Sequence, residues 1–267
     1  MRKIVWGILI LALLYLIGML IIFLIQRKFY YLPPDETGTP IAPPIGMAQV
    51  TNTSSLGHDV MAWWAPPADG GDVVVYFHGN GSAVIQGGFL YQDMMMAGLG
   101  VLAAEYPGYP RSSGTPSEAN IIAAAEAHYE FLISQGIRSE NIHLYGTSLG
   151  AGVAAQLASR KQVGSLILEA PFYSMVDMIK LRLPIYGFRP LVRDKYESYR
   201  ALESVDVPLL WIHGTVDQVI PIEEGRRLYD GYTGPKSQYV ISGGTHQNLW
   251  ISGGRERIIA FLTDVRP

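Results

Sequence analysis

The sequence predicts an α/β fold with a mostly parallel sheet of the eight-stranded type, helices on both faces, a small lid insertion and one preceding transmembrane helix. Three observations lead to this prediction. Short apolar runs alternate with helical stretches over most of the chain, which is typical of a parallel sheet buried on both faces. One apolar insertion interrupts that alternation. The first residues form a long uncharged apolar run.

Composition limits the classes of protein that fit. A chain of 267 residues fits one large domain, and 49% hydrophobic with 16% charged residues excludes disorder. The net charge of -3 gives no electrostatic reason to expect a nucleic-acid partner. The chain has no cysteine, which excludes disulfides, thiolate metal sites and cysteine nucleophiles. No residue pattern indicates a metal or an organic cofactor.

The N-terminal run from Ile4 to Ile25 contains no charged residue. As a helix rising about 1.5 Å per residue, it is roughly 33 Å long and crosses a bilayer core of about 30 Å. A cleavable signal peptide is the alternative, but its apolar region would be shorter and end at small residues. The sequence therefore predicts a retained single-pass membrane anchor.

Charges flank this run on both sides, with Arg2 and Lys3 before it and Arg27 and Lys28 after it. Counting the amino terminus, the positive-inside rule favours a position of the following domain on the periplasmic or extracytoplasmic side. Five prolines between Leu32 and Pro44 predict an extended spacer. The predicted organisation is an anchor over 1–28, a proline-rich spacer over 29–45 and one α/β domain over 46–267.

The α/β domain is expected to open with an antiparallel strand pair and to continue with strands and helices in turn. Strands are predicted at 46–54, 59–65, 72–77, 99–105, 141–145, 163–168, 208–212 and 237–241. Helices are predicted at 84–97, 119–135 and 148–160, with one more after each of the last two strands.

The segment from about 174 to 200 breaks this alternation. It is rich in large apolar residues, and Pro184, Gly187 and Pro190 divide it into short helices. We expect a small lid over the site. The alternative is an ordinary connecting helix packed on the sheet.

A candidate nucleophile lies in Gly146-Thr-Ser148-Leu-Gly150, which matches the pattern G-x-S-x-G. The motif follows a predicted strand and opens a small-residue helix. In that setting the serine is held on a sharp exposed turn, and the glycines allow backbones to approach closely. The alternative is a serine N-cap with packing glycines. We interpret Ser148 as a nucleophile.

A serine hydroxyl needs a base to take its proton. In this setting the partners follow in the chain order serine, acid, histidine, and only His213 and His246 come after Ser148. His246 lies in a glycine-rich loop between the last strand and the last helix, whereas His213 ends a strand. His246 is therefore the predicted base.

The acid that orients this histidine is predicted to be Asp217, on the loop after the strand at 208–212. Glu169, at the end of the preceding strand, is the better rival among the other carboxylates and is interpreted as a site-wall or structural residue. Metal ligation is not predicted anywhere in this constellation.

An oxyanion hole needs preorganised N–H donors. One is expected from Leu149, the residue after the nucleophile, and one from the loop at 78–81. Asn80 is the candidate in that loop, with Gly81 as the near alternative. His78 is expected to hydrogen-bond within the loop rather than to bind a metal.

These motifs together resemble the BEM46-like and ABHD13-like branch of the α/β-hydrolases, membrane-anchored serine hydrolases, over nearly the whole chain. One departure is Pro110, where that branch usually has glycine. The matching stretches are His78-Gly-Asn-Gly81, Glu105-Tyr-Pro-Gly-Tyr-Pro-Arg-Ser-Ser-Gly-Thr-Pro-Ser-Glu118, Gly146-Thr-Ser-Leu-Gly150, Glu169-Ala-Pro-Phe172, Pro208-Leu-Leu-Trp-Ile-His-Gly-Thr-Val-Asp217 and Gly243-Gly-Thr-His246.

The resemblance implies hydrolysis of carboxylic esters or thioesters, with lipid-like acyl groups as plausible small-molecule substrates. A peptidase of the same fold and a membrane-tethered binding protein without activity are the alternatives. An aspartate nucleophile, as in dehalogenases, is disfavoured because Ser148 occupies that position. The sequence leaves open the acyl chain length, the leaving group, the oligomeric state and whether Arg182, Arg189 and Arg193 bind substrate.

Overall fold

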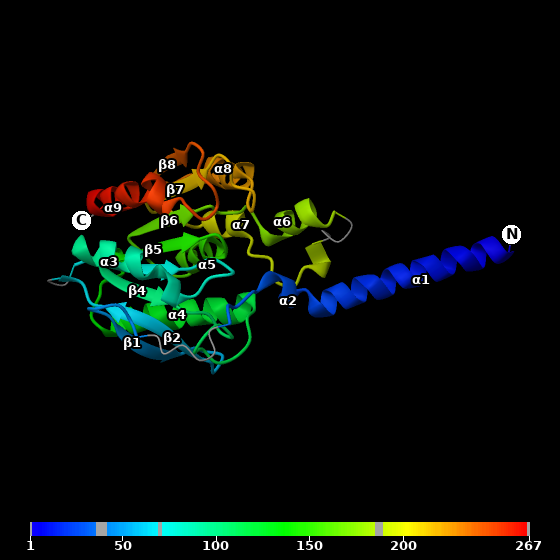
Figure 1. Cartoon of the computed structure of the whole chain (residues 1–267), viewed down its shortest axis with the longest axis horizontal. Helices are drawn as coiled ribbons and strands as arrows, with labels where there is room; N and C mark the ends of the chain where they lie inside the picture. Colours follow the sequence, from blue (N-terminus) through cyan, green and yellow to red (C-terminus); the bar gives the residue numbers. More distant parts are fainter. Residues whose placement is uncertain (1, 36–41, 69–70, 185–188, 266–267) are drawn as a thin grey trace.

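One eight-stranded sheet runs through the part of the chain that the computed structural model describes, residues 2–35, 42–68, 71–184 and 189–265 (Figure 1). The strand order is β1-β2-β4-β3-β5-β6-β7-β8. β1 pairs with β2 and β2 with β4 in antiparallel fashion, and all the other pairs are parallel. The predicted fold class, including its opening antiparallel pair, is confirmed.

The strands are short, and each of them begins and ends within two residues of its predicted bounds. Their bounds are β1 (Ala48–Thr53), β2 (Asp59–Ala65), β3 (Val73–Phe77), β4 (Gly100–Ala104), β5 (Ile142–Thr147), β6 (Ser165–Glu169), β7 (Leu209–Gly214) and β8 (Lys236–Ile241).

Helices cover both faces of the sheet. Neighbouring side chains along a strand point to opposite sides, so these apolar strands present an apolar surface on each face that must be buried. In β3, Val73, Val75 and Phe77 belong to one buried apolar cluster and Val74 to the other. The first cluster is covered by α4 (Glu118–Ser134), α5 (Leu149–Ala158), α7 (Ser198–Leu202) and α8 (Ile222–Gly231). The second is covered by α3 (Gly88–Met96) and α9 (Arg255–Asp264).

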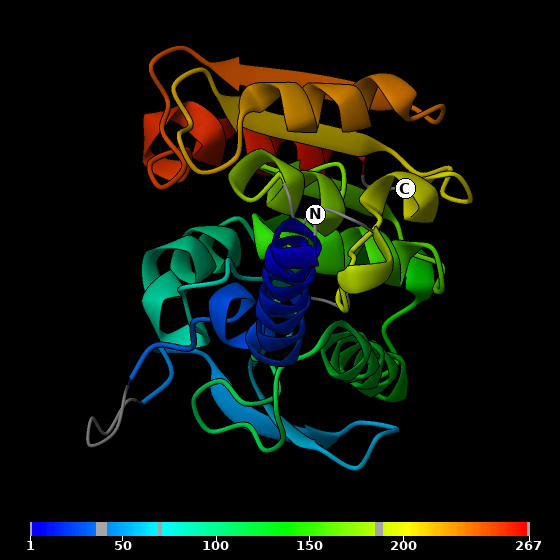
Figure 2. The same cartoon turned by 90° about the vertical axis from the view of Figure 1, so that its right-hand side faces the viewer.

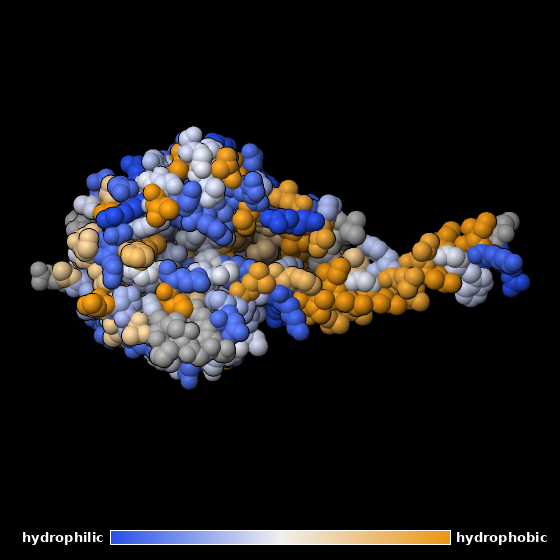
Figure 3. Space-filling model, viewed as in Figure 1, coloured by the Kyte–Doolittle hydropathy of each residue, from blue (hydrophilic) through white to orange (hydrophobic). Residues whose placement is uncertain are grey.

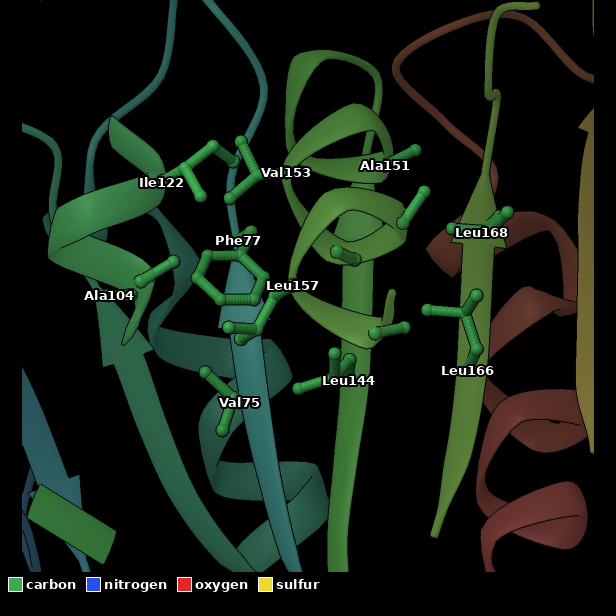
Figure 4. Close-up of a cluster of buried hydrophobic side chains, with 14 of the residues drawn as sticks. Val75, Phe77, Ala104, Ile122, Leu144, Ala151, Val153, Leu157, Leu166 and Leu168 are labelled. Atoms are coloured by element: carbon green, nitrogen blue, oxygen red, sulfur yellow. The ribbon is translucent and has the colours of Figure 1, made fainter. Parts of the chain in front are cut away.

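The helix that follows the candidate nucleophile packs at the centre of the first cluster (Figure 4). Val153 and Leu157 of α5 contribute to this cluster together with Val75 and Phe77 of β3. All four side chains are fully buried, and each such burial is worth about 1.5–3 kcal/mol. The sheet and α5 therefore hold the turn between β5 and α5 in a fixed place.

One predicted helix is divided in the structure. The segment predicted at 84–97 forms a short turn, η2 (Val84–Gly87), followed by α3. The ring of Tyr91 lies so close to Gly87 that a Cβ there would be 2.3 Å from it. The remaining short turns are η3 (Ser139–Asn141), η4 (Arg189–Leu191) and η5 (Trp250–Gly254).

The N-terminal apolar run forms α1 (Arg2–Ile25), which projects from the rest of the molecule (Figures 1 and 2). By length and composition α1 is able to cross a membrane. Its apolar surface contrasts with the mostly polar face of the body in Figure 3. α2 (Arg27–Tyr30) follows, and residues 36–41 of the predicted spacer lie outside the described residues.

The predicted lid consists of short helical pieces, as expected from its prolines. α6 (Met175–Arg182) is capped by Ser174, whose hydroxyl accepts a hydrogen bond from the Asp177 N–H. η4 and α7 complete the segment. Residues 185–188 of the predicted lid lie outside the described residues. Figure 1 shows α6 near the end of α1, on the side of the molecule from which α1 projects.

A buried histidine makes stability depend on pH. His128 of α4 is fully buried and accepts a hydrogen bond from Asn52 Nδ2 at 2.9 Å. Burial lowers the pKa of His128 to about 4. Since the unfolded value is about 6.5, the unfolded chain binds more protons below that pH, and stability falls as pH falls. From pH 7.5 to pH 5 we expect the free energy of unfolding to drop by about 2 kcal/mol through this residue.

Urea unfolding of the full chain in mild detergent at the two pH values measures this drop. His128→Asn removes the titrating group, so its free energy of unfolding is expected to vary less with pH than that of the wild type by that amount. Equal pH slopes in the two proteins would contradict the assignment to His128.

Candidate active site

Ser148 lies on the sharp turn between β5 and α5, as the motif predicts. Its backbone has φ 56 and ψ -115, a conformation that a non-glycine residue adopts only when its surroundings enforce it. The Ser148 N–H donates to the Glu169 carbonyl at 2.9 Å, and the Ala151 N–H donates to the Ser148 carbonyl at 3.0 Å. These bonds hold the serine at the end of the parallel strands.

The two glycines of the motif are required by close backbone contacts. A Cβ on Gly150 would lie 2.0 Å from the Phe77 carbonyl oxygen, and a Cβ on Gly146 would lie 2.1 Å from that of Gly150. Real Cβ atoms essentially never approach backbone so closely. The turn therefore fits against β3 only when both positions lack a side chain.

The structure brings the predicted acid and base together. The His246 ring presents Nδ1 to Asp217 Oδ2 at 2.7 Å. The Asp217 carboxylate is fully buried, while the His246 side chain keeps 14% of its surface exposed. Since an ionised carboxylate only accepts, Nδ1 is the donor and Nε2 is left to exchange a proton at the open side of the site.

Asp217 is surrounded by donors. Its Oδ1 accepts from the N–H groups of Val219 and Ile220, both at 2.8 Å, and His213 Nε2 lies 3.4 Å from Oδ2. Burial opposes ionisation, but hydrogen bonds from His213, His246 and Ile220 outweigh it and hold the pKa of Asp217 well below its usual range. His213, which was not chosen as the base because it ends a strand, thus contacts the acid directly.

The rival acid occupies a different place. Glu169 is buried and its carboxylate accepts a hydrogen bond from the Tyr145 hydroxyl. Burial raises the pKa of Glu169. No hydrogen bond among the described residues joins Glu169 to His246, and none joins Ser148 to His246. In structures without substrate, such catalytic bonds are often long.

The loop expected to supply an oxyanion donor follows β3 and is held by a buried network. His78 and Glu105 are fully buried, with His78 Nε2 at 2.7 Å from Glu105 Oε1 and Nδ1 at 2.8 Å from the Gly79 carbonyl oxygen. Glu105 also accepts from the N–H groups of Val84 and Tyr106, each at 3.1 Å. His78 thus bonds within the loop, as expected.

Asn80 is held next to the nucleophile. The Tyr109 hydroxyl contacts the Asn80 carbonyl at 2.8 Å and its side-chain Oδ1 at 2.9 Å. A Cβ on Gly79 would lie 3.5 Å from the Ser148 Cβ, so this loop passes directly over the serine. Leu149 opens α5, and its N–H has no i−4 partner within that helix.

A cavity of about 460 Å³ adjoins Ser148 and has a mostly apolar lining. Its size lies in the range of small-molecule sites, about 300–1,000 Å³. It is lined by Ile22, Gln26, Phe29, Tyr30, Asn80, Ser148, Leu149, Phe172, Met175, Met178, Ile179, Arg182, Leu183, Val219 and Ile220.

Comparison with known proteins identifies a matching family model and related chains. A family model described as serine hydrolase (FSH1) matches residues 137–247, the stretch that holds Ser148, Asp217 and His246. The protein Rv2307c of Mycobacterium tuberculosis strain H37Rv is 31% identical over 248 residues, 90% of this chain and 88% of that protein. Alpha/beta hydrolase domain-containing protein 17C of Xenopus tropicalis is 32% identical over 201 residues, 73% of this chain and 62% of its own length.

Among solved structures, the Pyrococcus furiosus esterase Pf2001 superposes with a TM-score of 0.70, covering 88% of this chain and 97% of its own at 19% identity. This likeness shows the shared fold. The chain belongs to the α/β-hydrolase family.

In this α/β-hydrolase the three arginines of the lid have different surroundings. Arg189 pairs with Glu197 through bonds of 2.7 and 2.9 Å. Arg193 lies over the ring of Phe23 at 5.7 Å. Arg182 alone of the three lines the cavity, where it donates to the Val219 carbonyl at 2.9 Å.

Sequence reasoning missed two sets of residues around the α/β-hydrolase site. One is the network of Glu105, Tyr106 and Tyr109, whose only signal was a motif shared with relatives. The other is the part of the cavity lined by Ile22, Gln26, Phe29 and Tyr30. No local pattern pairs these residues with the site. Among the described residues, no group of three His, Asp or Glu side chains lies close enough to hold a metal ion.

Proposed function

We propose that this α/β-hydrolase is a membrane-anchored serine esterase that cleaves carboxylic ester or thioester bonds of acyl substrates, with Ser148, Asp217 and His246 as its triad. The observation that carries the proposal is the meeting of three features at one end of the sheet. These are a serine on a constrained turn, a histidine hydrogen-bonded to a buried acid and an apolar cavity beside the serine.

The roles follow from hydrogen-bond geometry. Asp217 accepts from Nδ1 of His246, which leaves Nε2 to take the proton of the Ser148 hydroxyl. The serine oxygen then attacks the acyl carbon. The N–H groups of Leu149 and of Asn80, or of its neighbour Gly81, stabilise the negative oxygen of the tetrahedral intermediate.

Collapse of that intermediate breaks the bond to the leaving group, which receives the proton from His246. The product is an acyl group on Ser148. Water next gives a proton to His246 and attacks the acyl carbon, and the serine oxygen leaves and recovers that proton. The acid product and the free enzyme result, so the cycle needs only water as co-substrate.

The anchor places this chemistry at a membrane. The apolar helix α1 continues directly into the residues beside the site, and its flanking charges favour a periplasmic or extracytoplasmic position for the catalytic domain. A cleaved signal sequence is the competing reading of the same helix. The N-terminal sequence of the purified protein separates the two, since a retained anchor keeps residues 2–25.

Labelling with a fluorophosphonate tests the nucleophile without knowledge of the substrate. We expect one adduct on the full chain in detergent, located on Ser148 by mass spectrometry of the digested protein. Hydrolysis of p-nitrophenyl esters with two to sixteen carbons then tests ester cleavage. Folded protein that neither takes the label nor cleaves any ester of the series would instead support a tethered binding protein.

A further inference from the structure

The end of α1 is fixed to the lid rather than hanging from the domain. Met19 and Ile22 pack against a small apolar cluster formed by Val176, Ile179 and Val192. These five side chains join the N-terminal helix to the lid segment, although the two segments are far apart in sequence. Close packing of these side chains favours the docked position.

A buried amide strengthens this junction. Gln26, the residue between α1 and α2, is 1% exposed. Its side-chain nitrogen donates to the Leu191 carbonyl at 3.1 Å, and its side-chain oxygen accepts from the Arg193 N–H at 2.9 Å. Because an unsatisfied buried amide is costly, these bonds specify one position of the helix end against the lid.

Two further contacts hold the segment that follows α1, one to the lid and one to the loop at 78–81. Arg27 pairs with the buried carboxylate of Asp194 through bonds of 2.7 and 2.9 Å. The Leu32 N–H donates to Asn80 Oδ1 at 3.1 Å. The segment that follows α1 thus contacts both the lid and the loop expected to hold the oxyanion.

This docking makes α1 and α2 one wall of the cavity. Ile22, Gln26, Phe29 and Tyr30 line it together with Ser148, and α6 contributes residues of the same cavity. Ile22 precedes the end of α1 by three residues, or about 4.5 Å along the helix axis. The cavity therefore reaches from the nucleophile to the level of the apolar helix.

The rim of the cavity suits a membrane surface. Phe29 and Leu183 line the cavity and are exposed, and Leu181 of α6 is also exposed. The nearby chain carries exposed Lys28 and Lys180, whose long side chains reach headgroups while their stems remain apolar. Figure 2, seen along α1, shows that the helix projects from the same side that carries α2 and α6.

We infer that the esterase takes long-chain acyl esters directly from the bilayer that holds α1, and that Ile22 of the membrane helix limits the acyl chain. This inference rests on the proposed function. The acyl chain passes between the end of α1 and α6 and meets Ser148 at its ester end. The substrate class is accordingly a membrane-dissolved fatty-acyl ester rather than a short soluble one.

The test uses the full chain in nanodiscs of ether-linked phosphatidylcholine, which contain no ester of their own. The substrates are p-nitrophenyl butyrate and p-nitrophenyl palmitate, which differ only in the acyl chain. Ile22→Trp fills the cavity, and Ile21→Trp is the matched control because Ile21 is 51% exposed on the same helix. The quantity compared is the ratio of kcat/KM for palmitate to that for butyrate.

We expect Ile22→Trp to lower this ratio at least tenfold relative to wild type and Ile21→Trp to change it less than twofold. An equal ratio in the two variants would overturn the inference while leaving the esterase in place. The rate of Ser148 labelling by a small fluorophosphonate reports that each variant is folded. Wild-type protein that neither labels nor cleaves either ester would overturn the proposed function, and this inference with it.

Discussion

Ser148→Ala is expected to lower kcat for ester hydrolysis by up to about 10⁶-fold, and Asp217→Asn to lower it by about 10⁴-fold. The serine variant removes the atom that forms the acyl-enzyme. The asparagine variant keeps the shape of the acid, but its amide no longer fixes the His246 tautomer that leaves Nε2 free. Both rates are measured with p-nitrophenyl butyrate, and loss of fluorophosphonate labelling accompanies the serine variant.

The rival carboxylate supplies the comparison for this series. Glu169→Gln keeps a hydrogen-bonding group beside Tyr145, and Glu169 makes no hydrogen bond to His246 among the described residues, so the loss of activity is expected to be far smaller than that of Asp217→Asn. The reverse order would move the acid role to Glu169. Combining Ser148→Ala with Asp217→Asn is expected to cost no more than Ser148→Ala alone, because the triad acts as a unit.

The pH dependence follows from the same contacts. The folded pKa of Asp217 is depressed, so the stabilisation that it contributes is present above the pKa of the unfolded chain. It is lost only as pH falls through the lower folded value. Asp217 therefore stays ionised over the range in which hydrolysis is measured, and the acid limb of the kcat/KM profile belongs to another group of the free enzyme.

Gly150→Ala is expected to destabilise the protein by about 3 kcal/mol or more, or to prevent folding. The new Cβ would lie 2.0 Å from the Phe77 carbonyl oxygen and 2.8 Å from that of His78. Both are backbone atoms, so neither can turn away as a flexible side chain does. To relieve this steric clash α5 has to move away from β3, and that movement opens the central apolar cluster.

The matched control is Gly231→Ala at the end of α8. Nothing lies within 4 Å of a Cβ at that position, so alanine is expected to be neutral or to stabilise by up to about 1 kcal/mol. Urea unfolding in detergent measures both variants. A cost below about 1 kcal/mol at Gly150 would show that the turn relaxes easily and that its glycine serves another purpose.

The docked helix end also affects how truncated proteins should be interpreted. Removing residues 1–33 would strip the cavity of four lining residues and leave the Asp194 carboxylate buried without Arg27. A domain cut in this way lacks part of the proposed acyl site. Reconstituted full-length protein is therefore the form in which chain-length preference is informative.

Much of the fold could be predicted because its signals are local. Short apolar strands alternate with helices, and five prolines mark the segment after the membrane-sized helix. The candidate triad was also accessible from sequence, since the serine motif has a required strand–turn–helix setting and the partners follow in a set chain order. The structure places Asp217 and His246 2.7 Å apart, and kinetics must test their link to Ser148.

The sequence by itself determined the alternation of strands and helices, the apolar helix and the candidate catalytic residues, because each of these depends on residues close to one another in the sequence. Only the tertiary structure decided what surrounds them. Arg27 meets Asp194 across 167 positions of sequence, and His78 meets Glu105 across 27. Such contacts depend on how the sheet brings distant loops to one edge, and no local periodicity records them. For the same reason, the sequence predicted only a membrane anchor at the N-terminus, whereas in the structure the end of that helix lines the cavity beside Ser148.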